Sequence, residues 1–273
     1  MDFSERLARA WATHDSMLCA GLDPDPDRFP PAVGRDRDAI APFLEAIVAA
    51  TADLVCAYKP QIAHFAAVGA EGALEQVIAA IRREAPHALV ILDAKRGDIG
   101  STAEMYAREA FDRYGADAVT VNPYLGSDGV APFVARSDRG AVILCRTSNA
   151  SGRELQDVPE DRPLFERVAR LASERWNDRR NVMLVAGATQ PQELARIREL
   201  APGLPLLVPG IGAQGGDVDA VVAAGRDASG GGLVVSSSRA ILYASDGSDF
   251  AAAARAEAQR TRDALRRAHD AGR

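Results

Sequence analysis

The sequence lacks several features that would point to particular classes of protein. The 273-residue chain has no run of about 18 consecutive apolar residues, so no transmembrane helix is predicted. Its 32 Lys and Arg are outnumbered by 38 Asp and Glu, for a net charge of -6. Because nucleic-acid phosphates require basic faces, this balance argues against nucleic acid as the main partner. An acidic protein that binds an anion must use a local site instead.

Cysteine and histidine are also scarce. The three cysteines Cys19, Cys56 and Cys145 lie in three different apolar runs. Their odd number and wide spacing favour buried free thiols over a disulfide or metal site, and indicate a reducing, cytoplasmic setting. The four histidines show no ligand spacing, so zinc is not predicted. The first 15 residues carry early acidic residues and no apolar core, unlike a signal peptide.

Eight short apolar runs recur along the chain, each about as long as a strand. They are unbroken rather than alternating, which is typical of parallel strands covered on both faces. Between them lie stretches with helical spacing, such as Leu194, Ile197 and Leu200. Eight such units predict a (β/α)8 TIM barrel of the α/β class, with a doubly wound open sheet as the alternative. The runs are 17–22, 54–58, 88–92, 118–121, 141–145, 182–186, 204–208 and 233–235.

No linker rich in Pro, Gly or Ser divides the chain, so residues 1–273 are predicted to form a single domain. Phe3, Leu7 and Trp11 recur every four residues and predict a short N-terminal helix packed on the body. The tail at 251–273 is highly charged and helix-prone, which predicts a solvated closing helix. The polar segment 149–163 is long for a connector, and we expect a mobile covering loop there.

The third apolar run ends in the charged stretch DAKRGD, at residues 93–98. Residues two apart in a strand point the same way, so Asp93 and Lys95 are predicted to share the barrel's interior face. They would lie at the C-terminal mouth, where such barrels place their chemistry. Asp98 follows in a loop that is free to reach outward. Ser101 and Glu104 form an S-x-x-E pattern, which predicts a capping box at the next helix.

This charge pattern constrains the chemistry of Lys95. A lysine flanked by two carboxylates is held protonated, because opposite charges favour the charged form. A Schiff-base lysine needs the reverse, a depressed pKa. Lys95 is therefore predicted to donate a proton to a developing carbanion. Two alternatives are a structural ion triad and a magnesium site on Asp93 and Asp98, which the intervening ammonium opposes.

A glycine motif, PGIGAQGGD at 209–217, contains the formal pattern G-x-G-x-x-G of dinucleotide-binding proteins. It follows the seventh predicted strand, whereas that fingerprint belongs to the first βα turn. In a barrel, the loops after strands seven and eight commonly bind phosphate. The eighth run leads into SSSR, which adds Arg239. Two adjacent anion-binding loops predict a phosphate on the ligand; the alternative is glycine-rich turns with no ligand.

Together these motifs resemble the orotidine 5′-phosphate decarboxylase family, in its longer bacterial branch, type 2. The resemblance rests on DAKRGDI with AGLDPDP, YKP, TSN, PGIGAQGGD and SSSR, and runs from residue 20 to residue 241. It implies cofactor-independent decarboxylation of orotidine 5′-phosphate to uridine 5′-phosphate, without a metal, by a cytoplasmic homodimer. A magnesium-dependent 3-keto sugar-phosphate decarboxylase and a non-catalytic nucleotide-binding protein are the rival interpretations.

The resemblance also implies roles for nine residues. Lys95 corresponds to the general acid that protonates C6 of the pyrimidine, and Asp93 to the carboxylate that faces the substrate's own carboxylate. Asp98 and Thr102 correspond to residues lent across the dimer interface. The other residues are expected to bind substrate: Asp23 and Lys59 at the ribose hydroxyls, Ser148 at the pyrimidine, and Gln214 and Arg239 at the closing loop and phosphate. Many members have Gly-Arg where this chain has Ser238-Arg239, which leaves the backbone contact to phosphate there open.

Overall fold

The computed structural model describes residues 1–188, 191–210 and 217–271, and in this part of the chain eight parallel strands close into a barrel. Strands pair in sequence order, and β1 completes the barrel by pairing with β8, where Leu18 lies opposite Val235. The predicted TIM barrel is confirmed, and the alternative of an open sheet is wrong. The strands are β1 (Leu18–Leu22), β2 (Ala57–Pro60), β3 (Leu89–Arg96), β4 (Ala118–Val121), β5 (Gly140–Arg146), β6 (Val182–Ala186), β7 (Leu206–Pro209) and β8 (Leu233–Ser237).

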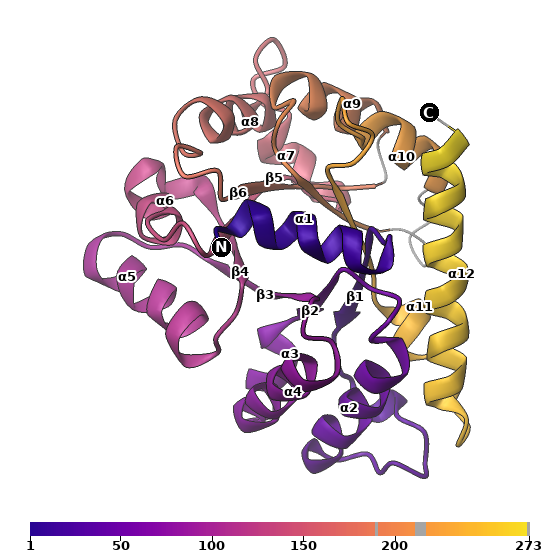
Figure 1. Cartoon of the computed structure of the whole chain (residues 1–273). Helices are drawn as coiled ribbons and strands as arrows, with labels where there is room; N and C mark the ends of the chain where they lie inside the picture. The colour runs from indigo at the N-terminus through magenta and orange to yellow at the C-terminus, as the bar shows by residue number, and fades with distance from the viewer. Residues whose placement is uncertain (189–190, 211–216, 272–273) are drawn as a thin grey trace.

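Helices surround the barrel, and α12 closes their ring by packing against both α2 and α10 (Figure 1). The α-helices are α1 (Phe3–His14), α2 (Ile40–Thr51), α3 (Ile62–Ala66), α4 (Glu71–Glu84), α5 (Gly100–Arg108), α6 (Ser127–Val134), α7 (Arg153–Gln156), α8 (Leu164–Glu174), α9 (Pro191–Leu200), α10 (Val218–Gly225), α11 (Arg239–Leu242) and α12 (Phe250–Ala271). Short 3-10 or π turns are η1 (Pro26–Arg28), η2 (Arg37–Ala39), η3 (Glu109–Arg113), η4 (Pro123–Leu125) and η5 (Ala150–Gly152). Among the described residues, no helix is long and apolar enough to cross a membrane.

The strands bury both faces, which explains their unbroken apolar sequences. Side chains such as Ile91 and Met183 belong to an inner cluster that fills the barrel, whereas Val90 and Leu184 belong to the larger cluster under the helices. Cys19, Cys56 and Cys145 are free and buried, as predicted. Burial raises the pKa of the Cys19 thiol to about 12, so that it stays neutral and unreactive near pH 7.

Helix α1 covers the inner cluster at the N-terminal end of the barrel (Figure 1). Its residues Phe3 and Leu7 are buried in that cluster, and Trp11 Nε1 donates a hydrogen bond to the carbonyl of Leu233 at 2.8 Å. Gly140 begins β5 directly beneath the Phe3 ring, and a Cβ at that position would overlap the ring. Glycine is therefore needed at this position for α1 to pack against the barrel.

The capping box predicted at Ser101 and Glu104 is wrong. Helix α5 begins one residue earlier, at Gly100, and Ile99 precedes it without a side-chain capping hydrogen bond. Gly100 has a φ of +54°, a left-handed conformation that glycine adopts at little cost, so the backbone makes this turn without a cap.

The expected covering loop at 149–163 is partly helical, since it contains η5 and α7. Buried Arg146, at the end of β5, ties it down through an ion pair with Asp157 at 3.2 Å and a hydrogen bond to Gln156 Oε1 at 3.0 Å. Glu193 of α9 holds the same guanidinium at 2.5 Å. This anchor could not be predicted from the sequence pattern, because Arg146 simply ends an apolar run.

Candidate active site

Three charged side chains meet at the C-terminal ends of β2 and β3. Asp93 is buried and accepts hydrogen bonds from two ammonium groups, Lys59 Nζ at 2.7 Å and Lys95 Nζ at 2.6 Å. Lys59 is also buried, whereas about half of the Lys95 side chain is exposed. Lys59 thus shares Asp93 with Lys95, and Lys95 is much the more exposed of the two at the mouth.

The two ammonium groups keep Asp93 ionised. Burial alone would raise the pKa of this carboxyl, but the nearby charges and hydrogen bonds of Lys59 and Lys95 outweigh burial and bring the pKa down to about 2. Burial alone would likewise lower the pKa of Lys59, yet the charges of Asp93 and Asp23 raise it above its ordinary value. At neutral pH the site therefore holds a carboxylate between two cations.

The backbone of β3 is irregular where it carries Lys95. This residue has a φ of +47°, and the register between β3 and β4 shifts between Leu92 and Arg96. A left-handed conformation is uncommon outside glycine and marks a strained position held by its surroundings. Lys95 and Asp93 do meet, as predicted, but through this bulge rather than through regular strand alternation.

Thr120 of β4 holds the bulge in place. Its Oγ1 accepts hydrogen bonds from the backbone N–H groups of Ala94 and Lys95, both at 2.9 Å, and donates one to Asp93 Oδ1 at 3.0 Å. A single hydroxyl thus fixes both the turn of the backbone and the carboxylate. The sequence pattern does not single out Thr120, because it lies inside the apolar run AVTV, where threonine is an ordinary strand residue.

Asp23 follows β1 and is held by residues that follow β8. Its Oδ2 accepts a hydrogen bond from Ser238 Oγ at 2.6 Å, and its carbonyl accepts one from the Tyr243 hydroxyl at 3.0 Å. Its other carboxylate oxygen, Oδ1, is buried without a hydrogen-bond partner in the part of the chain that the structure describes. A buried, unpaired carboxylate oxygen is costly, so it marks a place where a ligand donor would bind.

Asp98 and Thr102 lie apart from the charged cluster within one chain. Asp98 Oδ1 accepts a hydrogen bond from the backbone N–H of Ile99 at 2.7 Å, and no ion pair joins it to Lys95 among the described residues. Thr102 is exposed on α5. The second carboxylate predicted beside Lys95 is therefore not supplied by its own chain in this structure.

Two more predicted residues lie at strand ends of the same mouth. Ser148 follows β5 and packs against Gly187, which follows β6; a Cβ on Gly187 would lie 3.0 Å from the Ser148 nitrogen. Arg239 follows β8 as the first residue of α11; it is exposed and forms no ion pair with another described residue. Gln214 lies outside the described residues, as does most of the glycine motif, although Gly210 is described and has a φ of +100°.

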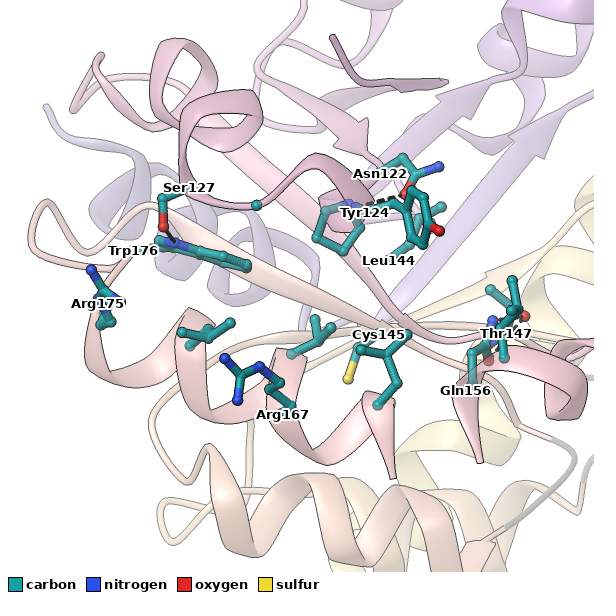
Figure 2. A pocket seen from close by; sticks show the side chains of 16 residues that line it. Asn122, Tyr124, Ser127, Leu144, Cys145, Thr147, Gln156, Arg167, Arg175 and Trp176 are labelled. Atoms are coloured by element: carbon teal, nitrogen blue, oxygen red, sulfur yellow. Dashed lines mark hydrogen bonds between the residues drawn. The ribbon is translucent and has the colours of Figure 1, made fainter. Parts of the chain in front are cut away.

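A cavity of about 670 Å³ is lined by residues other than those of the charged cluster (Figure 2). Residues of η4, β5, α7 and α8 line it, including Tyr124, Leu144 and Gln156, and Trp176 lines it just after α8. The Trp176 indole donates a hydrogen bond to Ser127 Oγ at 3.0 Å, so this wall of the cavity is fixed. None of the charged residues of the cluster is among its lining residues in the described chain, and its walls are mainly apolar.

In the described ranges, no group of three or more His, Cys, Asp and Glu side chains is arranged to hold a metal ion. The charged site instead offers an exposed ammonium, a buried carboxylate and a buried unpaired oxygen at one barrel mouth. Such a set can stabilise negative charge as it develops on a ligand and can deliver a proton to it.

Comparison with known proteins connects this site to a family. The model of the "Orotidine 5'-phosphate decarboxylase / HUMPS family" matches residues 16–256. A relative named orotidine 5'-phosphate decarboxylase, from Azoarcus sp. (strain BH72), is 60% identical over 267 residues, covering 97% of this chain and 98% of its own. One from Cellvibrio japonicus (strain Ueda107) is 57% identical over 94% of this chain and 96% of its own.

Solved structures agree with the sequence comparison. The structure of Leishmania donovani OMP decarboxylase superimposes with a TM-score of 0.86 at 37% identity, covering 99% of each chain. An orotidine-monophosphate-decarboxylase structure from Toxoplasma gondii, described as putative, gives a TM-score of 0.86 at 35% identity, over 97% of this chain and 98% of its own. The type 2 branch fits these matches and the chain length. The chain therefore belongs to the orotidine 5′-phosphate decarboxylase family.

Proposed function

We propose that Lys95 is the proton donor in the decarboxylation of orotidine 5′-phosphate by this protein. Membership of the family makes the protein a carboxy-lyase that forms uridine 5′-phosphate in pyrimidine biosynthesis. The observation that carries the proposal is the position of Lys95, half-exposed at the mouth with its Nζ 2.6 Å from the buried carboxylate of Asp93. An ammonium fixed there is complementary to negative charge that develops on a bound ring.

The proposed step needs only the groups of the chain and the substrate. The bond between C6 and the carboxylate carbon breaks, its electron pair stays on C6, and carbon dioxide leaves. Lys95 gives a proton to C6 and recovers one from water. Asp93 faces the departing carboxylate and keeps Lys95 in place. Because the fixed charges stabilise the developing carbanion more than they stabilise the bound substrate, they lower the activation free energy of decarboxylation.

The remaining residues are proposed to bind the parts of the substrate that do not react. Asp23 and Lys59 bind ribose hydroxyls, and the unpaired Asp23 Oδ1 supports that role. Ser148 reads the pyrimidine, and Arg239, an exposed cation at the end of β8, binds the phosphate together with Gln214. Contacts remote from C6 can organise the reacting groups through binding energy.

We further propose that the protein works as a homodimer in which Asp98 and Thr102 complete the partner's site. Large apolar side chains are exposed next to these residues: Ile99 and Met105 lie on β3–α5, and Tyr124 lies on η4. Exposed apolar groups gathered on neighbouring elements are typical of an interface. A second copy would cover them and bring a second carboxylate to Lys95, which pairs with Asp93 alone among the described residues.

A cytoplasmic location is proposed from the chemistry of the three cysteines. All are free thiols in a folded, buried state, which suits a reducing compartment.

The experiment is to add orotidine 5′-phosphate and follow the loss of its ultraviolet absorbance, with and without a chelator, and to identify the nucleotide product. We expect uridine 5′-phosphate at the same rate in both conditions. Loss of activity in chelator would favour the magnesium-dependent rival. Binding of uridine 5′-phosphate without release of carbon dioxide from orotidine 5′-phosphate would leave only a nucleotide-binding protein.

A further inference from the structure

The chain passes unusually close to itself where β1 and β8 end. These strands are neighbours in the closed barrel, with Ala20 opposite Ser237. One residue further along each strand, a Cβ built on Gly21 would lie 2.7 Å from the Cβ of Ser238. That distance is too short for two side chains, so Gly21 leaves the space that Ser238 occupies.

The side chain placed in that space points at Asp23. Ser238 Oγ donates to Asp23 Oδ2 at 2.6 Å, the length of a strong hydrogen bond to a carboxylate. The bond occupies one oxygen of the carboxylate, while the buried Oδ1 has no partner among the described residues. Ser238 thus sets which oxygen is free and where it points.

Tyr243 fixes the backbone of the same loop. Its hydroxyl donates to the carbonyl of Asp23 at 3.0 Å and accepts from the N–H of Asp25 at 2.8 Å. Burial raises the pKa of Tyr243 to about 12, so this hydroxyl keeps its proton at neutral pH. The Tyr243 N–H bonds the carbonyl of Arg239 at 3.1 Å, which makes residues 238–243 one compact turn.

We infer that Ser238 is a positioning residue that aims the Asp23 carboxylate at a ribose hydroxyl of the substrate. The inference rests on the proposed function, in which Asp23 binds the ribose and Arg239 binds the phosphate. The turn that carries Arg239 begins with Ser238 and ends with Tyr243, and both hold Asp23. The phosphate contact and the ribose contact are therefore built on one rigid unit, so that a substrate seated on Arg239 meets an Asp23 already in position.

The test compares the binding of two nucleotides to the full-length Ser238→Ala protein by calorimetry. Uridine 5′-phosphate has both ribose hydroxyls, and 2′,3′-dideoxyuridine 5′-phosphate has neither. We expect the variant to bind the first about tenfold more weakly, the effect of losing one charge-assisted hydrogen bond, and to bind the second within about twofold of wild type. Equal weakening of both nucleotides would place the Ser238 hydroxyl on the phosphate and overturn the inference.

A double-mutant cycle with Asp23→Ala gives a second readout that a merely structural residue would not move. In the Asp23→Ala background, Ser238→Ala should leave kcat/KM for orotidine 5′-phosphate unchanged within about twofold, because its target is gone. Full additivity of the two losses would overturn the inference. If Ser238→Ala fails to fold, as thermal unfolding would show, the same cycle is run with Ser238→Cys, which keeps the volume and weakens the donor.

The failures of the two proposals are distinguishable. A wild-type protein that does not decarboxylate orotidine 5′-phosphate contradicts the proposed function. An active enzyme in which Asp23→Ala binds both nucleotides as wild type does contradicts the role of Asp23 and, with it, the inference. An active enzyme with additive losses contradicts the role of Ser238 alone.

Discussion

Lys59 and Asp93 form an ion pair of 2.7 Å between neighbouring strands, with only 9% and 10% of their side-chain surfaces exposed. Removing two charges from water is costly, and the pair does not repay that cost by attraction alone. Such a pair is better explained by what it holds in place. Lys59 holds one oxygen of the Asp93 carboxylate and Lys95 holds the other, so the buried Lys59 fixes the group that positions Lys95.

The depressed pKa of Asp93 predicts how stability falls in acid. Its folded pKa is about 2, against 3.8 for an ordinary carboxyl, so the unfolded chain binds the proton first. The stabilisation is present above about pH 4 and is lost as the pH falls toward 2. For a shift of this size it amounts to roughly 2–3 kcal/mol. Urea unfolding at intervals between pH 5 and pH 2 should show this loss.

Asp93→Asn is the matched control for that titration, because it removes the group that takes up the proton. The difference in free energy of unfolding between wild type and Asp93→Asn should shrink as the pH falls from 4 to 2. A difference that stays constant over this range would show that Asp93 is not the titrating group.

Lys95→Ala should abolish turnover while leaving the affinity for uridine 5′-phosphate within about an order of magnitude. The proton is needed mainly in the transition state, whereas ribose and phosphate contacts dominate ground-state binding. Single-turnover decarboxylation and calorimetric binding measure the two quantities separately. Substantial decarboxylation by this variant would remove Lys95 from the role of proton donor.

Replacing Arg198 should lower the stability of the protein without lowering its catalytic activity. Its guanidinium donates hydrogen bonds to five backbone carbonyls, among them those of Gly225 at 2.8 Å, Leu204 at 2.7 Å and Gly232 at 3.2 Å. Leu204 and Gly232 lie just before β7 and β8, at the end of the barrel opposite the site. Burial lowers its pKa to about 10, so it remains charged near pH 7. Arg198→Met leaves these carbonyls without their donor and should cost about 2–4 kcal/mol in urea unfolding, with kcat unchanged.

Arg196 on the same helix is the control for Arg198. Its guanidinium makes surface ion pairs with Glu166 and Glu199, and exposed pairs contribute little to stability. Arg196→Met should therefore destabilise the protein far less than Arg198→Met. Similar losses in both variants would mean that α9 is sensitive to any arginine replacement.

The strands were predictable from sequence because burial on both faces leaves a local signature. Seven of the eight apolar runs coincide closely with strands; the run at 54–58 is the exception, since β2 begins at Ala57. Leu54, the first residue of that run, lies outside the strand, and its carbonyl accepts a hydrogen bond from Ser16 Oγ at 2.7 Å. The conformation of this run therefore depends on a contact with a residue 38 positions earlier, which lies outside any short stretch of sequence used for prediction.

The geometry of the charged site was not predictable in the same way. Alternation along a strand placed Asp93 and Lys95 on one face, but the bulge at Lys95 is fixed by Thr120 from the next strand. Likewise, the contact of Ser238 with Asp23 joins residues 215 places apart. The sequence supplied the residue types and the strand ends; the pairings between strands come from closure of the barrel.

The proposed shared active site can be tested by mixing two variants that are each inactive alone. In the proposed two-fold dimer, each subunit would lend Asp98 to the other's Lys95. Lys95→Ala and Asp98→Ala proteins should each be nearly inactive alone. In a mixed dimer, one site has both defects, and the other has an intact Lys95 beside an intact borrowed Asp98. Random exchange makes half of the dimers mixed, so activity per subunit should rise to about a quarter of wild type.

Mixing Lys95→Ala with Asp93→Ala is the matched control, because both residues belong to one chain's own cluster. No mixed dimer of that pair has an intact site, so activity should stay at the sum of the two proteins. Exchange itself is followed with differently tagged subunits. If tagged subunits exchange and the Lys95→Ala and Asp98→Ala mixture also stays at the sum, then Asp98 acts within its own chain. The Ile99 and Tyr124 surface would then need another explanation than a shared site.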